Sequence, residues 1–472
     1  MHHHSRRAAA RLAALATLVA ACQGAGTATS GSANPLAQRI DSIAAARLAT
    51  GQVAGFSIGV MKGNDTVVMK GYGSADLELE VPTPDGAIYE IGSVTKQFTA
   101  AAIMQLRDAG KLSLDDDLSK HLPDYPMQGR KVSIRRLLDH TSGIKGYTEM
   151  AVFGQMMTRD LPKDSLVAAF SREKFEFEPG ALEVYNNSAY FLAGLIIEKL
   201  SGMSYADYVK KNLFEKAGMP SSAYCSEKNV MKKKVKGYDY GPDSALHHKG
   251  FLVHTWPYAA GSLCASVRDL VAWNRALHNG QVLSPASYTE MITPGVLNDG
   301  TKLRYGTGLA LRNVGGHRLI EHGGGINGFL SASHYYPDDS LTVVVLINTA
   351  GPMAPDGFAV DVAMSILGRG EPKTETYSGD LNALAGEYVG VSRGQTMRAK
   401  VTIEGGKPVV RAGADRNVVM SGPEPKPVTL VYLGGGTWAD DETHYVFTMA
   451  GANASELRID ASYGYSILTR AK

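Results

Sequence analysis

The sequence predicts an α+β fold followed by a small all-β domain at the C-terminus. Helical patterns and short strands alternate through most of the chain, and after about residue 380 only short alternating strands with Gly-rich turns remain. At 472 residues the chain is too long for one ordinary domain. We therefore expect an α+β domain over residues 35–368, a linker over 369–380, and a small antiparallel β-barrel or β-sandwich over 381–472.

The N-terminal residues have the features of a targeting segment and are excluded from the fold. Arginines at positions 6, 7 and 11 precede an apolar run that is too short for an ordinary membrane span. The run ends in Leu-Val-Ala-Ala-Cys22, which resembles a bacterial lipobox. We expect a signal peptide over 1–22, an acylated Cys22 and a flexible tether over 23–34. The protein would then lie in the bacterial cell envelope, periplasmic or attached to the membrane by this lipid. A plain secretory signal cleaved near Ala21 is the alternative.

Composition limits the partners and cofactors. The chain is 44% hydrophobic and 20% charged with a net charge of +2, which is typical of a globular protein and does not favour nucleic-acid binding. The run Asp115-Asp116-Asp117 lacks the companion ligands of a calcium site, so we interpret it as a solvated turn and helix cap. Cys225 and Cys264 have no zinc-type spacing. We favour two separate buried thiols, with a disulfide left open, and expect no metal and no cofactor.

The first elements of the predicted α+β domain are a helix and a hairpin. Apolar residues at positions 36, 40, 43, 44 and 48 have the spacing of an amphipathic helix. Strands are then expected over 56–61 and 67–71, joined through Gly63-Asn64-Asp65, a sequence typical of a hairpin turn.

Ser93 and Lys96 form the first candidate catalytic pair. They stand at the start of an apolar helix that should end near Gly110, and residues three apart on a helix share one face. A serine is a poor nucleophile until a base takes its proton. A lysine becomes such a base only where burial or another cation lowers its pKa. The same Ser-x-x-Lys pattern occurs at Ser142 and Ser171, but neither opens a buried helix.

Tyr185 and Asn187 form a second candidate group, just before an apolar helix expected over 190–200. They stand two residues apart in an irregular stretch, so both side chains can point into one cleft. A nearby lysine favours the phenolate of a buried tyrosine, which makes Tyr185 a candidate shared base. An isolated tyrosine would instead pack its ring with its hydroxyl satisfied nearby. His140 ends a short helix expected over 133–139, and we interpret it as a structural histidine.

A third candidate segment runs from His322 to Gly325. Apolar residues lead up to it, and its glycines allow a ligand or another backbone to approach closely. The continuous apolar run over 341–347 predicts a strand that is covered on both faces. We therefore expect the segment from His322 to lie at a strand edge beside this central strand. A last helix of the domain is expected over 358–367.

Three motifs now stand in chain order: Ser93-x-x-Lys96, Tyr185-x-Asn187 and His322-Gly323-Gly324. With the flanks Leu138-Asp139-His140-Thr141-Ser142-Gly143 and Tyr185-Asn186-Asn187-Ser188-Ala189-Tyr190, they resemble the serine β-lactamase and penicillin-binding protein superfamily. The branch they resemble contains class C β-lactamases and related esterases, D-aminopeptidases and D-Ala carboxypeptidases. The resemblance covers about residues 36–367. It implies a helical domain packed on an antiparallel sheet flanked by helices, with the site between them.

The resemblance also implies a role for each matching residue. Ser93 would be the nucleophile that accepts the acyl group, and Lys96 and Tyr185 would form the base and proton shuttle. Whether the lysine acts alone as the base is disputed for these enzymes, so we treat the two as one coupled unit. Asn187 would hold the substrate amide and Lys96.

The third motif would bind the substrate through His322, Gly323 and Gly324, and the N–H groups of Ser93 and Gly325 would form the oxyanion hole. In typical β-lactamases and carboxypeptidases this motif begins with a lysine, a fixed cation for the substrate carboxylate. Here it begins with His322, which is mostly neutral near pH 7 at its reference pKa of about 6.5. Carboxylate recognition should therefore be weaker and pH-dependent.

The sequence thus predicts a secreted serine hydrolase that forms an acyl-enzyme with esters, amides or peptides. A class C-type β-lactamase or D-Ala-D-Ala carboxypeptidase is the alternative within this class. A non-catalytic penicillin-binding or sensor protein, or a structural envelope protein with an incidental match, is the alternative of another class. The natural substrate, the oligomeric state and the role of the C-terminal domain stay open.

Overall fold

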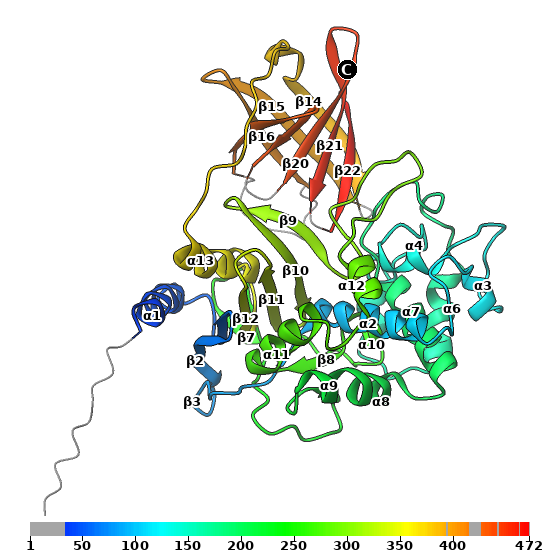
Figure 1. Ribbon diagram of the computed structural model, residues 1–472, viewed down its shortest axis with the longest axis vertical. Helices are drawn as coiled ribbons and strands as arrows, with labels where there is room; N and C mark the ends of the chain where they lie inside the picture. The colour runs from blue at the N-terminus through cyan, green and yellow to red at the C-terminus, as the bar shows by residue number, and fades with distance from the viewer. Residues whose placement is uncertain (1–33, 393–394, 415–425, 441–442, 462, 472) are drawn as a thin grey trace, which may run out of the picture.

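The computed structural model describes residues 34–392, 395–414, 426–440, 443–461 and 463–471 (Figure 1). The predicted signal peptide and Cys22 lie outside the described residues. None of the helices in the described ranges combines the length and the apolar character needed to cross a bilayer. In Figure 1 a large body of helices and strands carries a separate unit of strands, which contains the C-terminus, at the top of the view.

The large body is built on a seven-stranded antiparallel sheet. In spatial order its strands are β3 (Val81–Pro82), β2 (Asp65–Asp76), β1 (Gly55–Lys62), β12 (Leu341–Ile347), β11 (Phe329–Tyr336), β10 (His317–Ile326) and β9 (Ala310–Val314). β1 and β2 form the predicted hairpin, and β12 lies between β1 and β11. Every residue of β12 is buried, as its apolar sequence predicts.

Helices cover both faces of this sheet. Four of them are α1 (Pro35–Leu48), α2 (Thr95–Asp108), α11 (Val267–His278) and α13 (Pro355–Leu367). Because successive side chains of a strand point to opposite faces, β12 contributes to two separate cores. Val343 and Val345 pack in the core that contains α1 and α13, whereas Val344 and Leu346 pack in the core that contains α2 and α11. The predicted α+β architecture, an antiparallel sheet flanked by helices, is confirmed.

A helical region adjoins the sheet on the side of α2 (Figure 1). Its helices are α3 (Leu118–His121), α4 (Ile134–Leu138), α5 (Phe153–Met156), α6 (Lys163–Ser171), α7 (Asn187–Ser201), α8 (Tyr205–Val209), α9 (Glu215–Ala217), α10 (Tyr258–Gly261) and α12 (Pro285–Met291), with shorter or irregular helical segments η1 (Gly92–Val94), η2 (Tyr147–Glu149) and η3 (Lys210–Phe214). Asp117 caps α3, in agreement with the interpretation of the acidic run. α2 is buried along almost its whole length, and its polar side chains bond inside the core: Thr99 Oγ1 donates to the Ala259 carbonyl (2.6 Å). α2 is therefore a rigid support.

Two small three-stranded sheets complete the large body. One contains β13 (Thr349–Ala350), β6 (Tyr238–Tyr240) and β7 (Leu246–His248), and the other contains β4 (Tyr89–Glu90), β8 (Leu263–Ala265) and β5 (Ala223–Tyr224). Cys264 in β8 forms a disulfide with Cys225, which directly follows β5. This corrects the preference for two separate thiols. The pairing of β5 with β8 brings together two residues that are 39 positions apart, a tertiary contact that the cysteine spacing did not reveal.

The C-terminal unit is a closed antiparallel barrel. After the short helix η4 (Leu381–Ala383) its strands are β14 (Gly386–Ser392), β15 (Gln395–Glu404), β16 (Lys407–Ala414), β17 (Val428–Thr429), β18 (Val431–Gly434), β19 (Thr437–Ala439), β20 (His444–Ala450), β21 (Asn453–Ala461) and β22 (Gly464–Arg470). The two ends of its sheet, β17 and β18, are successive parts of one extended stretch, so this stretch joins β16 to β19 and closes the sheet. The unit has a core of its own, which includes Tyr388, Trp438 and Leu457. The predicted all-β domain is confirmed, and of the two forms left open it is the barrel.

Candidate active site

Ser93 lies in η1, the tight turn that leads into α2. Ser93 is partly exposed, whereas Lys96 on the first turn of α2 is completely buried. Lys96 Nζ lies 3.0 Å from Ser93 Oγ, which is the contact that the three-residue spacing predicts. The turn therefore presents a hydroxyl to solvent with an amine fixed directly beneath it.

The Lys96 amine contacts oxygen atoms from three separate segments of the chain. Besides Ser93 Oγ, Nζ lies 2.8 Å from Asn187 Oδ1 and 2.8 Å from the Ala260 carbonyl oxygen. As an ammonium group it donates to all three oxygens. As a neutral amine it can donate to Asn187 and Ala260 while its lone pair accepts the Ser93 proton. The same geometry therefore serves both protonation states of a catalytic base.

Tyr185 lies beside the same amine. Lys96 Nζ is 4.7 Å from the centroid of the Tyr185 ring, and Tyr185 is 9% exposed. The ring of His140 lies 4.3 Å from that of Tyr185, and its Nδ1 accepts the Asn186 N–H (3.1 Å). His140 is thus a buried structural residue, as predicted, and it fixes the segment that carries Tyr185 to the helical region.

Asn187 is the first residue of α7, whereas the sequence analysis placed it in an irregular turn before that helix. The helix begins early because Asn186 is a strong N-cap, and its Oδ1 accepts the Ala189 N–H (2.8 Å). Asn187 Nδ2 donates to Thr148 Oγ1 (3.1 Å), which in turn donates to Glu149 Oε2 (2.9 Å). The amide therefore has a fixed orientation. Thr148 was not predicted from the sequence, because no local pattern distinguishes it.

The glycines of β10 lie directly against the nucleophile turn. A Cβ on Gly324 would lie 3.0 Å from Ser93 N and closer still to the Ile91 carbonyl oxygen. On the other side of the contact, Gly92 has a φ of +49°, and a Cβ on it would lie 2.9 Å from Gly325 N. The strand and the turn can approach this closely only because both carry glycine here.

The outer edge of β10 is open beside Ser93. β9 pairs with β10 only as far as Glu321, so the following residues have no neighbouring strand on that side. The Gly323 N–H points to this open side, because it donates to the Tyr463 hydroxyl (2.6 Å). Since strand geometry repeats every two residues, the Gly325 N–H points the same way. The Gly325 N–H therefore points to the open edge beside the Ser93 turn, as an oxyanion-hole donor requires.

His322 is buried (1% exposed) and both of its ring nitrogens are engaged. Nδ1–H donates to the Gly323 carbonyl (2.6 Å), and Nε2 accepts the Tyr305 hydroxyl (2.9 Å). Burial and the positive charge of Lys96 lower the pKa of His322 to about 3. His322 is therefore neutral at pH 7. The sequence predicted pH-dependent carboxylate binding through His322. The structure does not support this prediction, because His322 does not change its charge near neutral pH.

Tyr463 is a residue of the site that the sequence analysis did not identify. It comes from the turn between β21 and β22 of the C-terminal barrel, and its hydroxyl donates to Glu321 Oε2 (2.7 Å). Its ring lies 5.1 Å from that of His322 and 5.6 Å from that of Tyr185. Tyr463 is 140 positions from Gly323, so no local motif could have indicated it.

A buried ionic cluster lies behind this end of β10. Glu321, His334 and Asp356 have ligand atoms within 4.8 Å of one another. Arg312 Nη1 lies among them, 3.5 Å from Glu321 Oε1 and 3.2 Å from Asp356 Oδ2. A guanidinium in this position neutralises the carboxylates, so the group is a salt-bridge network rather than a cation site.

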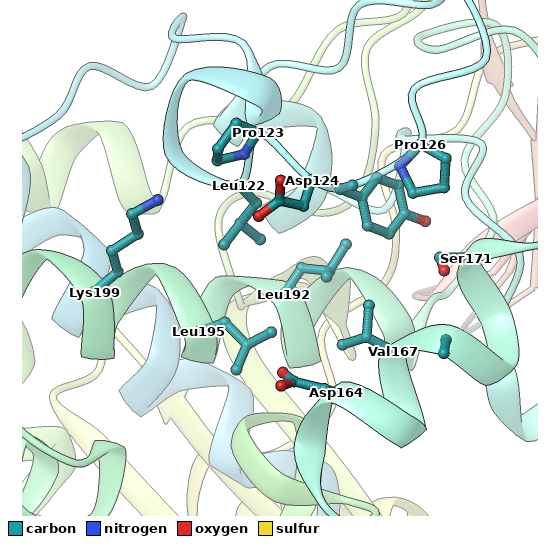
Figure 2. Close-up of a pocket in the computed structure, with 12 residues that line it drawn as sticks. Leu122, Pro123, Asp124, Pro126, Asp164, Val167, Ser171, Leu192, Leu195 and Lys199 are labelled. Carbon is teal, nitrogen blue, oxygen red and sulfur yellow. The ribbon is translucent and has the colours of Figure 1, made fainter.

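Pocket size does not identify this site. A pocket of about 440 Å³ lies in the helical region, where Leu192 and Leu195 of α7 and the charged Lys199 line it (Figure 2). None of the residues that line it belongs to the Ser93 group. The candidate site is instead defined by convergent polar groups at the start of α2 and α7.

Residues 40–366 match the family model described as Beta-lactamase, and the chain belongs to this family. The family predicted from the three motifs is therefore confirmed. Penicillin-binding protein 4* of Bacillus subtilis (strain 168) is 30% identical over 303 residues, a match that covers 61% of this chain and 66% of that relative. The chain thus spans about two thirds of the length of this relative.

Two solved structures extend the comparison. The octameric penicillin-binding protein homologue from Pyrococcus abyssi has 26% identity and a TM-score of 0.61, and the match covers 91% of this chain and 99% of that one. A D-stereospecific amidohydrolase from Streptomyces sp. has 25% identity and a TM-score of 0.60 over 71% of this chain and 99% of that one. Both structures share the predicted fold, and one of them is named an amidohydrolase, in agreement with the predicted hydrolase class.

Proposed function

We propose that this protein cleaves esters, amides or peptides through an acyl-enzyme on Ser93. The observation that carries the proposal is the buried Lys96 amine 3.0 Å from Ser93 Oγ, held by Asn187 and Ala260. The Streptomyces relative is named an amidohydrolase, which supports amides among the substrates.

The site residues divide the reaction among them. Ser93 Oγ attacks the substrate carbonyl carbon while its proton passes to the coupled pair of Lys96 and Tyr185. The oxygen that becomes negative accepts hydrogen bonds from the N–H groups of Ser93 and Gly325, and one such donor lowers the barrier by about 2.7–4 kcal/mol. The pair then returns the proton to the leaving group as the carbon–leaving-group bond breaks. Water then attacks the acyl-enzyme, gives its proton to the pair of Lys96 and Tyr185, and the pair returns a proton to Ser93 Oγ as the acyl group leaves. Asn187 holds the acyl side of the substrate.

The state of His322 ranks the substrate classes. A β-lactam or a C-terminal D-Ala peptide carries a carboxylate, which the family's lysine would bind. Here the corresponding residue is a neutral, buried histidine with both nitrogens engaged. We therefore place esters, amides and peptides without a carboxylate next to the scissile bond ahead of β-lactams.

The test compares the purified protein with Ser93→Ala, using p-nitrophenyl acetate and a chromogenic cephalosporin. The matched control is Ser171→Ala, which removes the serine of another Ser-x-x-Lys pattern, away from the site. Continuous turnover that is lost only in Ser93→Ala supports the hydrolase. A single stoichiometric burst would indicate a sensor that acylates without turnover. No reaction, or equal turnover in all three proteins, would refute the proposal.

We also propose attachment to the bacterial cell envelope through Cys22, supported by the lipobox-like sequence alone. Labelled palmitate should be incorporated into the full-length protein expressed in a bacterium, and Cys22→Ala should abolish the label. Equal labelling of both proteins, or labelling of neither, would contradict this location.

A further inference from the structure

The C-terminal barrel is docked onto the segment that carries Tyr185. Val184 forms an isolated antiparallel bridge with Gly464, and Arg304 Nη1 donates to the Asp460 carbonyl (2.9 Å). Gly464 has a φ of +118°, and a Cβ on it would lie 2.9 Å from the Glu183 carbonyl oxygen. These contacts fix the turn between β21 and β22 against the site, with Tyr463 at its tip.

Tyr463 occupies the open edge of β10. Its hydroxyl accepts the Gly323 N–H (2.6 Å) and donates to Glu321 Oε2 (2.7 Å), so both of its polar functions are used. A Cβ on Gly323 would lie 3.1 Å from this hydroxyl oxygen, so the missing side chain at position 323 leaves the room that Tyr463 fills. The barrel thus supplies a side chain to the strand edge from 140 residues away.

This contact blocks one direction in which a substrate could extend. The N–H groups of Gly325 and Gly323 point to the same side of β10, and an extended substrate could pair with both. Tyr463 already holds the Gly323 N–H and lies over His322. A substrate bound at Gly325 therefore has no room to continue along β10 toward His322.

The charges at this end are unfavourable for an anion. The Glu321 carboxylate accepts a hydrogen bond from the Tyr463 hydroxyl, and Arg312 is shared between Glu321 and Asp356. His322 contributes no cation, because both of its nitrogens are engaged with neutral groups. A substrate carboxylate here would lose its hydration without gaining a partner, because Arg312 is already engaged by Glu321 and Asp356.

We propose that Tyr463 is a specificity-determining residue that closes the leaving-group end of the cleft and excludes substrates whose leaving group carries a carboxylate. The proposal rests on the proposed function, in which Lys96 and Tyr185 return the proton to the leaving group. We therefore place the leaving group beside Tyr185, whose ring lies 6.2 Å from that of His322. The preferred substrates would have small or uncharged leaving groups, such as an alcohol, ammonia or an amine without a carboxylate.

The test uses two acetate esters of equal size in the full-length protein: 3-carbamoylphenyl acetate, with a neutral leaving group, and 3-carboxyphenyl acetate, with an anionic one. The readout is the ratio of kcat/KM for the neutral ester to that for the anionic ester, with kcat and KM separated. We expect a ratio of at least ten in the wild type. Tyr463→Ala should lower this ratio at least tenfold, mainly through a lower KM for the anionic ester.

Two further variants keep the test decisive. Tyr463→Phe retains the ring but frees the Gly323 N–H, and we expect it to lower the ratio at least threefold; this variant decides if Tyr463→Ala does not fold. Tyr465→Ala, in the adjoining strand β22, removes a ring that packs against Arg458 and leaves the Tyr463 hydroxyl contacts in place, so it should leave the ratio unchanged. An unchanged ratio in folded Tyr463 variants would overturn this inference while Ser93-dependent turnover still upheld the proposed function. Absence of Ser93-dependent turnover with both esters would overturn both.

Discussion

Replacing Gly324 with alanine should damage catalysis without removing any catalytic group. A Cβ at this position would lie 3.0 Å from Ser93 N and closer still to the Ile91 carbonyl oxygen, whereas ordinary contacts begin at 3.4 Å. Both neighbours are backbone atoms at the start of a buried helix, so the strand and the turn must separate by about 1 Å. Misplacement by about 1 Å can cost about 10²-fold in rate, or roughly 2.7 kcal/mol of barrier. We also expect overpacking to lower the free energy of unfolding by about 1–3 kcal/mol.

The matched control is Gly325→Ala, one residue further along the same strand. Its Cβ would meet only a Leu330 methyl group at 3.5 Å, an ordinary contact, and the N–H group stays in place. The assay is kcat/KM with p-nitrophenyl acetate, with thermal unfolding measured in parallel. The Gly324 variant should lose about 10²-fold, and the Gly325 variant should stay within threefold of the wild type. Comparable activity in the two variants, whether high or low, would refute the close approach as the reason for glycine at position 324.

Three further predictions follow from single contacts. Lys96→Met should lower kcat/KM by about 10²–10⁴-fold because it removes the proposed base; a loss below tenfold in steady-state kinetics would contradict that role. Replacing Cys225 and Cys264 with alanine should lower the free energy of unfolding by about 2–4 kcal/mol in urea titrations under oxidising conditions. The double variant and the reduced wild type should have the same free energy of unfolding. Burial raises the pKa of Asp139 from 3.8 to about 6, so its contribution to stability is present below pH 3.8 and is lost as the pH rises through 6. Between pH 4 and 7 the free energy of unfolding of the wild type should fall by about 2.4 kcal/mol relative to that of Asp139→Asn, and parallel pH profiles would count against this assignment.

Local patterns predicted the elements that carry the chemistry. The apolar helix after Ser93 and the apolar run over 341–347 are long and uninterrupted, and the structure buries both. The contact of Ser93 with Lys96 follows from helix geometry alone, because the two residues belong to one turn. Where an element is determined by its own sequence, its position in the site could be predicted from that sequence.

Contacts between distant segments could not be predicted in this way. The disulfide depends on the pairing of β5 with β8, and a cysteine count gives no information about strand pairing. Asn187 was predicted to lie in a turn rather than in α7, because the first residues of α7 are polar and its apolar pattern begins only after them. The engagement of both His322 nitrogens required the position of Tyr305, which no motif includes.

Local contacts build the part of the site that carries out the reaction, whereas contacts between distant segments build the part that selects the substrate. Ser93 and Lys96, which perform the proposed proton transfer and attack, lie one turn apart where η1 leads into α2, and they need only the burial of that helix. The leaving-group end is assembled from β10 and from the barrel turn that carries Tyr463, which are joined only by tertiary contacts. Changes in the barrel can therefore alter which substrates reach Ser93 while the nucleophile and its base stay in place. For this reason the family assignment indicates the reaction more strongly than it indicates the substrate.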